Sequence, residues 1–206
     1  MSEKAPIPLE FDPQIILSKY DPDSKVKQYL DLLEAENKNI NLVSRETSHS
    51  DLTRLAAESL LPFEVIKSRQ FLNYLDIGSG GGFPAFPIIM SFNPRRSVLV
   101  ERTKKKASAL NRMSEQMGLP IEVCEQNFDE CEFSGKFDLI TLRLVRLTKP
   151  LFKKISELLT SKGVFIYYSK FEDDGDIKNL QGTAYSYASG RDSPIKTFTV
   201  FSRTSG

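Results

Sequence analysis

Apolar residues recur at two different spacings along the chain, and the spacing changes near residue 70. Before that point they recur every three or four residues, at Val26, Tyr29, Leu30 and Leu33 and again at Leu52, Leu55, Ala56 and Leu60. This spacing predicts two amphipathic helices, the second beginning at a cap formed by Ser50 or Asp51. The first 23 residues are rich in Pro and Asp, so we expect them to be extended against the body or partly disordered.

Beyond residue 70, short apolar runs alternate with helical patterns. The runs cover residues 71–77, 98–101, 121–124, 137–142 and 163–168. Helices are expected from Pro84 to about Phe92, up to Met117, and over residues 151–159, and Gly118 and Gly163 stand where helices commonly stop. Strands that alternate with helices predict a parallel sheet with right-handed crossovers.

The end of the chain has a different pattern. Residues 174–179 are expected to form a loop or short helix, and residues 183–189 and 196–203 read as two strands. Because the linker between these two strands is short, we expect them to pair antiparallel.

The length and composition indicate one domain. A chain of 206 residues can bury one substantial core but is short for two ordinary domains. We treat residues 1–70 as an extension whose helices pack on a core formed by residues 71–206. Hydrophobic content is 40%, charged content is 27% and the net charge is +1. This balance gives no global attraction to nucleic acid or membrane, so a polyanion would have to meet a local patch.

Several classes of protein are disfavoured by what the sequence lacks. Residues 1–10 contain no apolar leader region, and no stretch approaches the roughly 18 apolar residues of a membrane span, so we expect a cytoplasmic protein. Cys124, Cys131 and His49 show neither a disulfide framework nor zinc-ligand spacing, and no metal is expected. His49 is expected at the surface, and Cys124 is expected to pack as a small apolar residue.

The most informative stretch is 74–84, where an apolar strand ends in Asp76 and runs into Gly78, Ser79, Gly80, Gly81 and Gly82. Glycines let the backbone adopt positive φ and approach a ligand closely. A dinucleotide fingerprint would need a glycine at Phe83, so the pattern is G-x-G-x-G, which resembles motif I of S-adenosyl-L-methionine (SAM) methyltransferases. Pro84 is expected to start the following helix. The alternative is a tight turn without a ligand.

Polar residues also follow the other predicted strands, where an open α/β sheet binds its ligand. Glu101 is placed to accept hydrogen bonds from the two hydroxyls of a ribose, as an otherwise unpaired carboxylate. Asp129 could accept from an adenine amino group while Phe128 offers its backbone N–H to the ring. Arg143 follows the fourth strand. For each carboxylate the alternative is a solvated loop residue.

Two groups of cations are candidates for contact with a phosphate backbone. The first group opens the helix after the second strand, and the second follows the fourth strand. Their members are Arg102, Lys104, Lys105, Lys106 and Arg112 in the first group, and Arg143, Arg146, Lys149, Lys153 and Lys154 in the second. Ordinary solvated faces are the alternative.

Over residues 36–171 these features resemble the RsmG (GidB) family, bacterial methyltransferases that act on guanine N7 in 16S ribosomal RNA. The matching segments are 37–42 (N-K-x-x-N-L), 54–60 (R-H-x-x-D-S-L), 75–84 (L-D-x-G-S-G-x-G-F-P) and the basic helix 104–110. The resemblance implies a Rossmann-like class I methyltransferase with a mostly parallel seven-stranded sheet, a C-terminal antiparallel hairpin and an N-terminal helical extension. It also implies SAM as cofactor, 16S rRNA or the small ribosomal subunit as partner, and a monomer.

The resemblance implies a set of site residues as well. Those expected to bind the cofactor are Asp76, Gly78, Ser79, Gly80, Gly82, Phe83, Glu101, Phe128, Asp129 and Arg143. Arg143 is also expected at the mouth shared by cofactor and substrate. Together with Lys170, which matches a family lysine, it is expected to orient the RNA during catalysis.

Several positions depart from the family pattern, and they lie mainly on the RNA side. Glu58 stands for an aspartate, Asn127 for an arginine and Phe171 for a glycine, while Leu142 and Leu144 flank Arg143 in place of the usual S-R-A. Two alternatives therefore stay open. One is a SAM-dependent methyltransferase with a small-molecule or protein acceptor, and the other is a non-catalytic SAM-binding protein associated with the ribosome.

Overall fold

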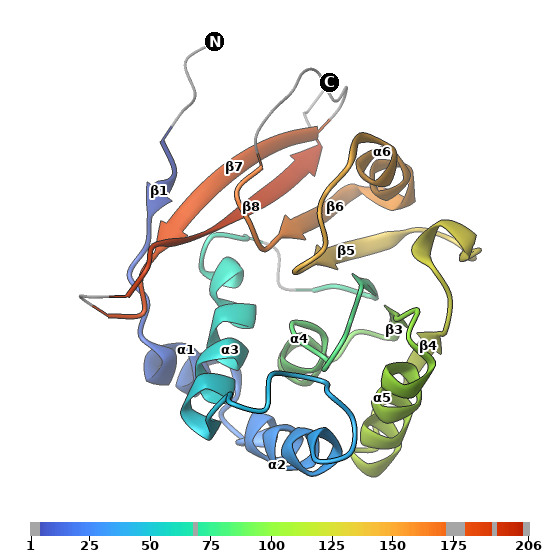
Figure 1. The fold of residues 1–206 in the computed structure, drawn as a ribbon. Coiled ribbons are helices and arrows are strands. Elements are labelled where there is room, and N and C mark those ends of the chain that lie inside the picture. The colour runs from blue at the N-terminus through green and yellow to red at the C-terminus, as the bar shows by residue number, and fades with distance from the viewer. Residues whose placement is uncertain (1–4, 68–69, 172–179, 191–192, 204–206) are drawn as a thin grey trace.

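The computed structural model describes residues 5–67, 70–171, 180–190 and 193–203. Figure 1 shows one twisted sheet with helices on both of its faces. The strands are β1 (Ile7–Pro8), β2 (Asn73–Ile77), β3 (Arg96–Val100), β4 (Ile121–Cys124), β5 (Phe137–Leu142), β6 (Leu159–Tyr167), β7 (Leu180–Tyr187) and β8 (Lys196–Arg203). The helices are α1 (Pro13–Tyr20), α2 (Lys25–Asn37), α3 (His49–Leu60), α4 (Ala85–Phe92), α5 (Lys104–Gln116) and α6 (Lys149–Leu158), with short 3-10 helices η1 (Leu61–Glu64) and η2 (Phe128–Glu130).

The sheet order is β1-β7-β8-β6-β5-β2-β3-β4. The five strands from β6 to β4 are parallel to one another, and β8 runs antiparallel to both β6 and β7. The predicted parallel sheet and C-terminal antiparallel pair are therefore confirmed. After β4 the chain crosses to the other side of β2 to form β5, so the strand order reverses between β2 and β5. Because β2, β3, β4 and β5 are parallel, their carboxyl ends lie along one edge of the sheet.

The N-terminal segment is only partly as expected. Residues 7–8 lie extended against the body as β1, an eighth strand that pairs with Tyr185 and Ser186 of β7, but the segment also forms the unexpected helix α1. Asp12 caps α1 by accepting from the backbone N–H groups of Gln14 and Ile15 at 2.8 and 3.2 Å, and Pro13 occupies the first helical turn. An Asp-Pro pair is a helix-start signal. The sequence analysis missed this helix because it took the Pro and Asp residues of the whole segment as signs of extended or disordered chain.

Three local expectations were also wrong. The cap of α3 is Ser48, which forms a reciprocal capping box with Asp51, rather than Ser50 or Asp51. Pro84 is the residue before α4, which begins at Ala85, and the Phe83–Pro84 peptide bond is cis. Gly163 lies inside β6, where a Cβ would come within 3.0 Å of the Phe137 carbonyl oxygen, so close backbone approach explains the glycine. Gly118, at φ +63°, does end α5 as predicted.

Two apolar layers cover the sheet. Leu99, Leu139 and other residues of one sheet face pack with α1 to α5, whereas Leu75 and Ile140 of the opposite face pack with Phe152 of α6. Side chains from both sides of residue 70 share the first layer, and the division at that residue stays a prediction. The expected loop or short helix at 174–179 lies outside the described residues. In the described part of the chain, no helix combines the length and apolarity that a membrane crossing requires.

Candidate methyl-transfer site

The glycine turn is drawn tightly against the end of β3. The backbone N–H groups of Gly78 and Ser79 both donate to the carbonyl oxygen of Val100, at 2.9 and 3.0 Å. Gly78 has φ +76°, and a Cβ there would lie 2.7 Å from Cγ2 of Val145. Both the backbone angle and the close approach therefore require glycine at this position.

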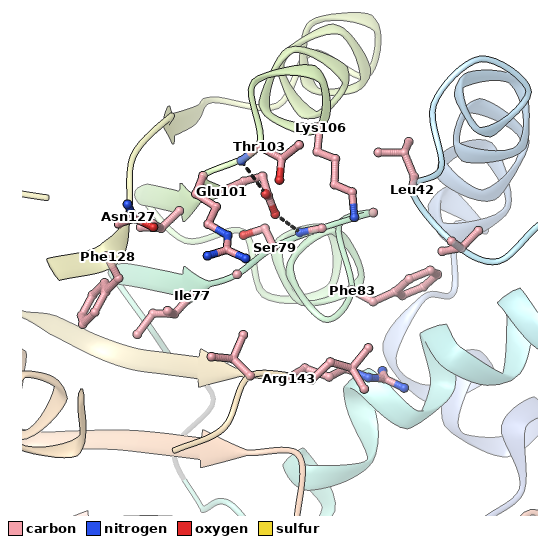
Figure 2. A pocket seen from close by; sticks show the side chains of 18 of the residues that line it. Leu42, Ile77, Ser79, Phe83, Glu101, Thr103, Lys106, Asn127, Phe128 and Arg143 are labelled. Atoms are coloured by element: carbon pink, nitrogen blue, oxygen red, sulfur yellow. Dashed lines mark hydrogen bonds between the residues drawn. The ribbon is translucent and has the colours of Figure 1, made fainter. Parts of the chain in front are cut away.

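Glu101 fixes the turn from the other side, as Figure 2 shows. Its Oε2 accepts from the backbone N–H of Gly80 at 2.9 Å and its Oε1 accepts from that of Thr103 at 2.8 Å. The side chain is 7% exposed. The sequence analysis expected an otherwise unpaired carboxylate, but the backbone anchors both of its oxygens. Because each carboxylate oxygen can accept two hydrogen bonds, each still has capacity for a ligand donor.

A cavity of about 620 Å³ opens at this edge of the sheet, within the size range of small-molecule sites. Its lining residues are Leu42, Val43, Leu55, Ile77, Gly78, Ser79, Gly80, Gly81, Phe83, Val100, Glu101, Arg102, Thr103, Lys106, Gln126, Asn127, Phe128, Arg143, Leu144 and Val145. Seven residues of the predicted site are among them, namely Gly78, Ser79, Gly80, Phe83, Glu101, Phe128 and Arg143. The other four, Asp76, Gly82, Asp129 and Lys170, lie outside this lining.

Asp76 lies buried behind the turn, with 1% of its surface exposed. Thr141, on the neighbouring strand β5, donates its hydroxyl to Oδ1 at 2.5 Å, whereas Oδ2 has no hydrogen-bond partner. Burial raises the pKa of Asp76 to about 6. Thr141 was not predicted as a partner of Asp76, because the contact depends on the register between β2 and β5.

Gly82 serves the packing behind the turn. A Cβ at this position would lie 2.6 Å from Cδ2 of Phe86 and 3.0 Å from the hydroxyl of Tyr29. Tyr29, on α2, stacks on Phe86 with ring centroids 4.8 Å apart and donates its hydroxyl to the Gly81 carbonyl oxygen at 2.8 Å. The missing side chain at Gly82 therefore lets α2 support the turn.

The segment between α2 and α3 supplies a wall that the sequence analysis did not assign. Leu42 and Val43 line the cavity, and their backbone N–H groups donate to Oδ1 of Asn37 at 2.8 and 3.0 Å. This bracing gives a physical reason for the Asn at the start of N-K-x-x-N-L. Lys106, Leu144 and Val145 are further lining residues that were not predicted as cofactor contacts.

The segment after β4 forms the remaining wall. Phe128 is 8% exposed and lines the cavity together with Asn127, the residue that departs from the family arginine. Asp129 is exposed and is not among the residues that line the cavity. Lys154 holds the segment in place, because its ammonium donates to the carbonyl oxygens of Phe128 and Asp129 at 2.5 and 3.0 Å. Lys154 is therefore used structurally rather than being available to a phosphate.

The two cysteines flank this segment. Their sulfur atoms lie 2.6 Å apart, and both are free thiols. Burial raises the pKa of Cys131 to about 12. A thiol with so high a pKa is a poor nucleophile near neutral pH.

Arg143 reaches from the end of β5 towards α3, as Figure 2 shows. Its guanidinium pairs with the carboxylate of Glu58 at 3.0 Å and lies 5.6 Å from the ring centre of Tyr168. Glu58 is 1% exposed and also pairs with Lys196 of β8 at 2.5 Å. Three elements thus converge on one buried carboxylate, and Arg143 is held firmly at the cavity wall.

The remaining predicted cations are distributed unevenly. Lys170 is exposed just after β6. Arg112 forms an ion pair with Glu36, with nitrogen–oxygen distances of 2.6 and 2.9 Å. Its charge is therefore balanced within the protein, and we no longer count it in the first basic group. The exposed members of the two groups are Arg102, Lys104 and Lys105 in the first, and Arg146, Lys149 and Lys153 in the second.

One cluster of potential metal ligands exists in the described part of the chain. Asp31, Glu34 and His49 bring one ligand atom each to within 4.8 Å of one another. His49 is exposed, as predicted, and its Nδ1 lies 3.3 Å from Glu34. These groups lie at the surface and outside the cavity lining, so they form no part of the candidate site.

The parallel sheet and the glycine turn with its anchored acidic residue define a Rossmann-like class I methyltransferase. Solved structures agree with this fold. The O-methyltransferase TomG from Streptomyces achromogenes, in complex with SAM, matches with a TM-score of 0.61 at 15% identity over 95% of this chain and 100% of that one. The Bacillus cereus O-methyltransferase in complex with SAH matches with a TM-score of 0.63 at 18% identity, over 93% and 96%.

Sequence comparison identifies the particular family. The GidB profile, described as rRNA small subunit methyltransferase G, matches residues 23–199, and the chain belongs to this family. The ribosomal RNA small subunit methyltransferase G of Brachyspira hyodysenteriae is 31% identical over 82% of this chain and 84% of its own length. That of Helicobacter pylori is 32% identical over 69% and 79%. The predicted family is thereby confirmed, over a longer stretch than the motifs indicated.

Proposed function

We propose that the protein transfers a methyl group from SAM to N7 of a guanine in 16S ribosomal RNA. The observation that carries this proposal is the Glu101 carboxylate, anchored by Gly80 and Thr103 at the edge of a cavity of about 620 Å³. Membership of the small-subunit methyltransferase G family supports the RNA substrate.

The residues of the cavity fit the cofactor. Glu101 can accept hydrogen bonds from ribose hydroxyls with the lone pairs that the backbone leaves open. Ile77, Val100 and Phe128 provide an apolar wall for an adenine ring, and the turn at Gly78 leaves room for close approach. Asp76 has an orphaned buried oxygen behind that turn. SAM supplies an electrophilic sulfonium methyl group.

The acceptor explains why the site needs no general base. N7 of guanine is a neutral lone pair that has no proton to lose before it attacks a methyl carbon. The protein therefore acts by positioning, holding the acceptor about 3–3.5 Å from that carbon and in line with the bond that breaks. The cavity contains no histidine among its lining residues, which agrees with catalysis of this kind.

Arg143 and Lys170 are proposed for the acceptor side. Arg143 lines the cavity, and its guanidinium is held in position by the ion pair with Glu58. Lys170 lies beyond the lining, where an ammonium can meet a phosphate. The exposed basic groups after β3 and β5 are proposed to meet the RNA backbone, and Asp129 stays a proposed contact to adenine. The protein is proposed to act as a monomer in the cytoplasm, where ribosomal subunits are made.

The test is transfer of radiolabelled methyl from SAM to small ribosomal subunits that lack guanine N7 methylation. Strand scission at 7-methylguanine then locates the label. A single labelled guanine is the expected result. Label on another atom, or none at all despite SAM binding, would contradict the proposal.

The division of the site can be tested with two substitutions. Gly78→Asp is expected to abolish SAM binding, because a side chain cannot fit beside Val145. Lys170→Ala is expected to weaken binding of the small subunit by a few-fold while SAM affinity stays unchanged. Lys162→Ala, at an exposed lysine elsewhere on β6, is the matched control. Equal losses of SAM affinity in Gly78→Asp and Lys170→Ala would contradict the assigned roles.

One observation favours a second candidate function. Glu58 occupies the Arg143 guanidinium, and this leaves fewer donors for a guanine edge or a phosphate. A methyltransferase with a small-molecule or protein acceptor would be compatible with that arrangement. A salt titration separates the candidates, because binding of RNA weakens steeply with salt and binding of a neutral small molecule does not.

A further inference from the structure

Leu144 is the most exposed large apolar residue of the described chain, with 98% of its surface accessible. It directly follows Arg143 and belongs to the residues that line the cavity. Its backbone has φ +58°, in the left-handed region that residues with bulky side chains rarely adopt.

Folding alone does not account for this residue. An almost fully accessible side chain gains nothing from burial, and the left-handed backbone is unfavourable for leucine. The adjacent residue behaves differently, because Val145 is 36% exposed and approaches the Gly78 turn. A strained backbone that presents an apolar side chain beside a cavity is a feature typical of functional sites.

The surroundings of Leu144 indicate a polyanion. Arg102 and Lys106 line the same cavity, and exposed Arg146 lies two residues further along the chain. The whole chain has a net charge of only +1, so attraction of a polyanion depends on local cations such as these. An apolar tip beside cations matches the chemistry of nucleic acid, whose bases are apolar on their faces and whose backbone is anionic.

We propose that Leu144 is a wedge that inserts into the RNA beside the target guanine and fills the space which that base leaves when it turns into the cavity. This inference rests on the proposed function. A base within a stack cannot present its ring to a cavity walled by Glu101 and Phe128, so it must first be extruded. Apolar side chains such as leucine are used elsewhere to separate neighbouring bases.

The base of the wedge is rigid. Arg143, immediately before Leu144, is 12% exposed and is bound to the buried carboxylate of Glu58. Beyond Leu144, Val145 packs towards the turn that carries Gly78. Both neighbours are therefore fixed, and only the Leu144 side chain projects. A projecting group on a fixed support keeps its geometry when the RNA is deformed.

The test compares Leu144→Ala and Leu144→Met with Ile15→Ala, which removes another exposed aliphatic side chain from outside the cavity lining. The readouts are SAM affinity by calorimetry and kcat/KM for methylation of small ribosomal subunits. Leu144→Ala is expected to lower kcat/KM about tenfold or more, since the energy needed to separate the bases is then no longer offset by the inserted side chain. SAM affinity is expected to stay unchanged, Leu144→Met to retain most activity, and Ile15→Ala to match the wild type.

Leu144→Gly separates activity from stability. Glycine adopts φ +58° without strain, so the melting temperature is expected to rise by about 2–4 °C while methylation falls as in Leu144→Ala. A loss of activity accompanied by greater stability could not be attributed to misfolding. A Leu144→Gly variant with lower stability and lower activity would overturn the wedge, since Leu144 would then support the fold.

Failure of the wedge can be distinguished from failure of the proposed function. Guanine methylation by the wild type tests the function. If the wild type is active and Leu144→Ala is equally active, the wedge is overturned and the function stands. Weaker SAM binding in Leu144→Ala would also overturn it. Protein-free 16S rRNA completes the test, because a loss seen only with intact subunits would show that Leu144 contacts a ribosomal protein instead.

Discussion

At the scale of single residues, the glycines of the turn have separate roles. Gly78 faces the cavity and has no room for a Cβ, whereas Gly82 makes room for Phe86 and Tyr29 behind the turn. The glycine motif therefore serves two purposes. Gly78 leaves space on the side of the cavity, and Gly82 leaves space for side chains packed behind the turn. Substitutions at the two positions should fail for different reasons.

Gly78→Ala can be compared with Gly118→Ala. Both glycines have positive φ, at +76° and +63°, so each substitution should cost about 1 kcal/mol of stability through the backbone. Only Gly78 meets a neighbour, at 2.7 Å, whereas nothing lies within 4 Å of a Cβ at Gly118. We expect SAM affinity to fall at least tenfold in Gly78→Ala alone, measured by calorimetry beside thermal melts. Equal SAM affinities in the two variants would contradict a role for Gly78 in the cavity.

Asp76 makes stability depend on pH. Burial raises its pKa from 3.8 to about 6, so the folded state binds a proton more tightly than the unfolded state does. Stability should therefore fall as the pH rises through this window and level off above it. Relative to Asp76→Asn, the wild type is expected to lose about 3 kcal/mol between about pH 4 and pH 7. Urea unfolding across this range measures the difference.

Asp129→Asn is the control for that series, because Asp129 is exposed and lies outside the cavity lining. It makes the same chemical change at the surface, so it reports the effect of removing one carboxylate without altering a buried group. A stability difference between Asp76→Asn and the wild type that does not change with pH would show that Asp76 titrates alike in both states.

At the scale of elements, α2 supports the turn through Tyr29. Tyr29→Phe removes the hydrogen bond to the Gly81 carbonyl while it keeps the stacked ring on Phe86. We expect a loss of about 1–2 kcal/mol of stability together with a several-fold loss of SAM affinity, because the turn loses a buried restraint. Calorimetry and urea unfolding provide the two values.

The control for this prediction is Tyr20→Phe. The Tyr20 hydroxyl donates to Glu64 at 2.7 Å, and neither residue lines the cavity. This variant should lose stability without losing SAM affinity. If both tyrosine variants bind SAM equally well, α2 does not support the turn in the way described.

The sequence predicted elements best where one local signal dominated. The bounds of β4 and β5 agree with the predicted runs 121–124 and 137–142, because apolar residues fill them between clear breaks. The prediction missed β1, whose two residues are ordered by pairing with β7, a partner far along the chain. The site follows the same division between local and distant signals. Glu101 was predictable because it directly follows an apolar run, whereas the contacts of Thr141 and Glu58 depend on packing between segments that are distant in the chain.

At the scale of the whole molecule, a net charge of +1 leaves attraction to RNA to local groups. Removing Lys104 and Lys105 together should reduce the salt dependence of binding to the small subunit by about 1.5 in the log–log slope, since each phosphate contact contributes about 0.7–0.9. Filter binding over a salt series measures the slope. A paired Lys27→Ala and Lys162→Ala variant changes the net charge equally, and an equal fall in its slope would mean that total charge alone matters.

The strand order has a consequence for biosynthesis. β8 lies between β6 and β7, although it follows both in the chain. While a ribosome is still making β8, β7 has only the two-residue strand β1 as a neighbour and β6 presents an open edge. Unpaired edges invite association between nascent chains. Lys196, which completes the ion cluster around Glu58, arrives with that same strand. Each copy of the protein must therefore be synthesised through β8 before its own site is complete.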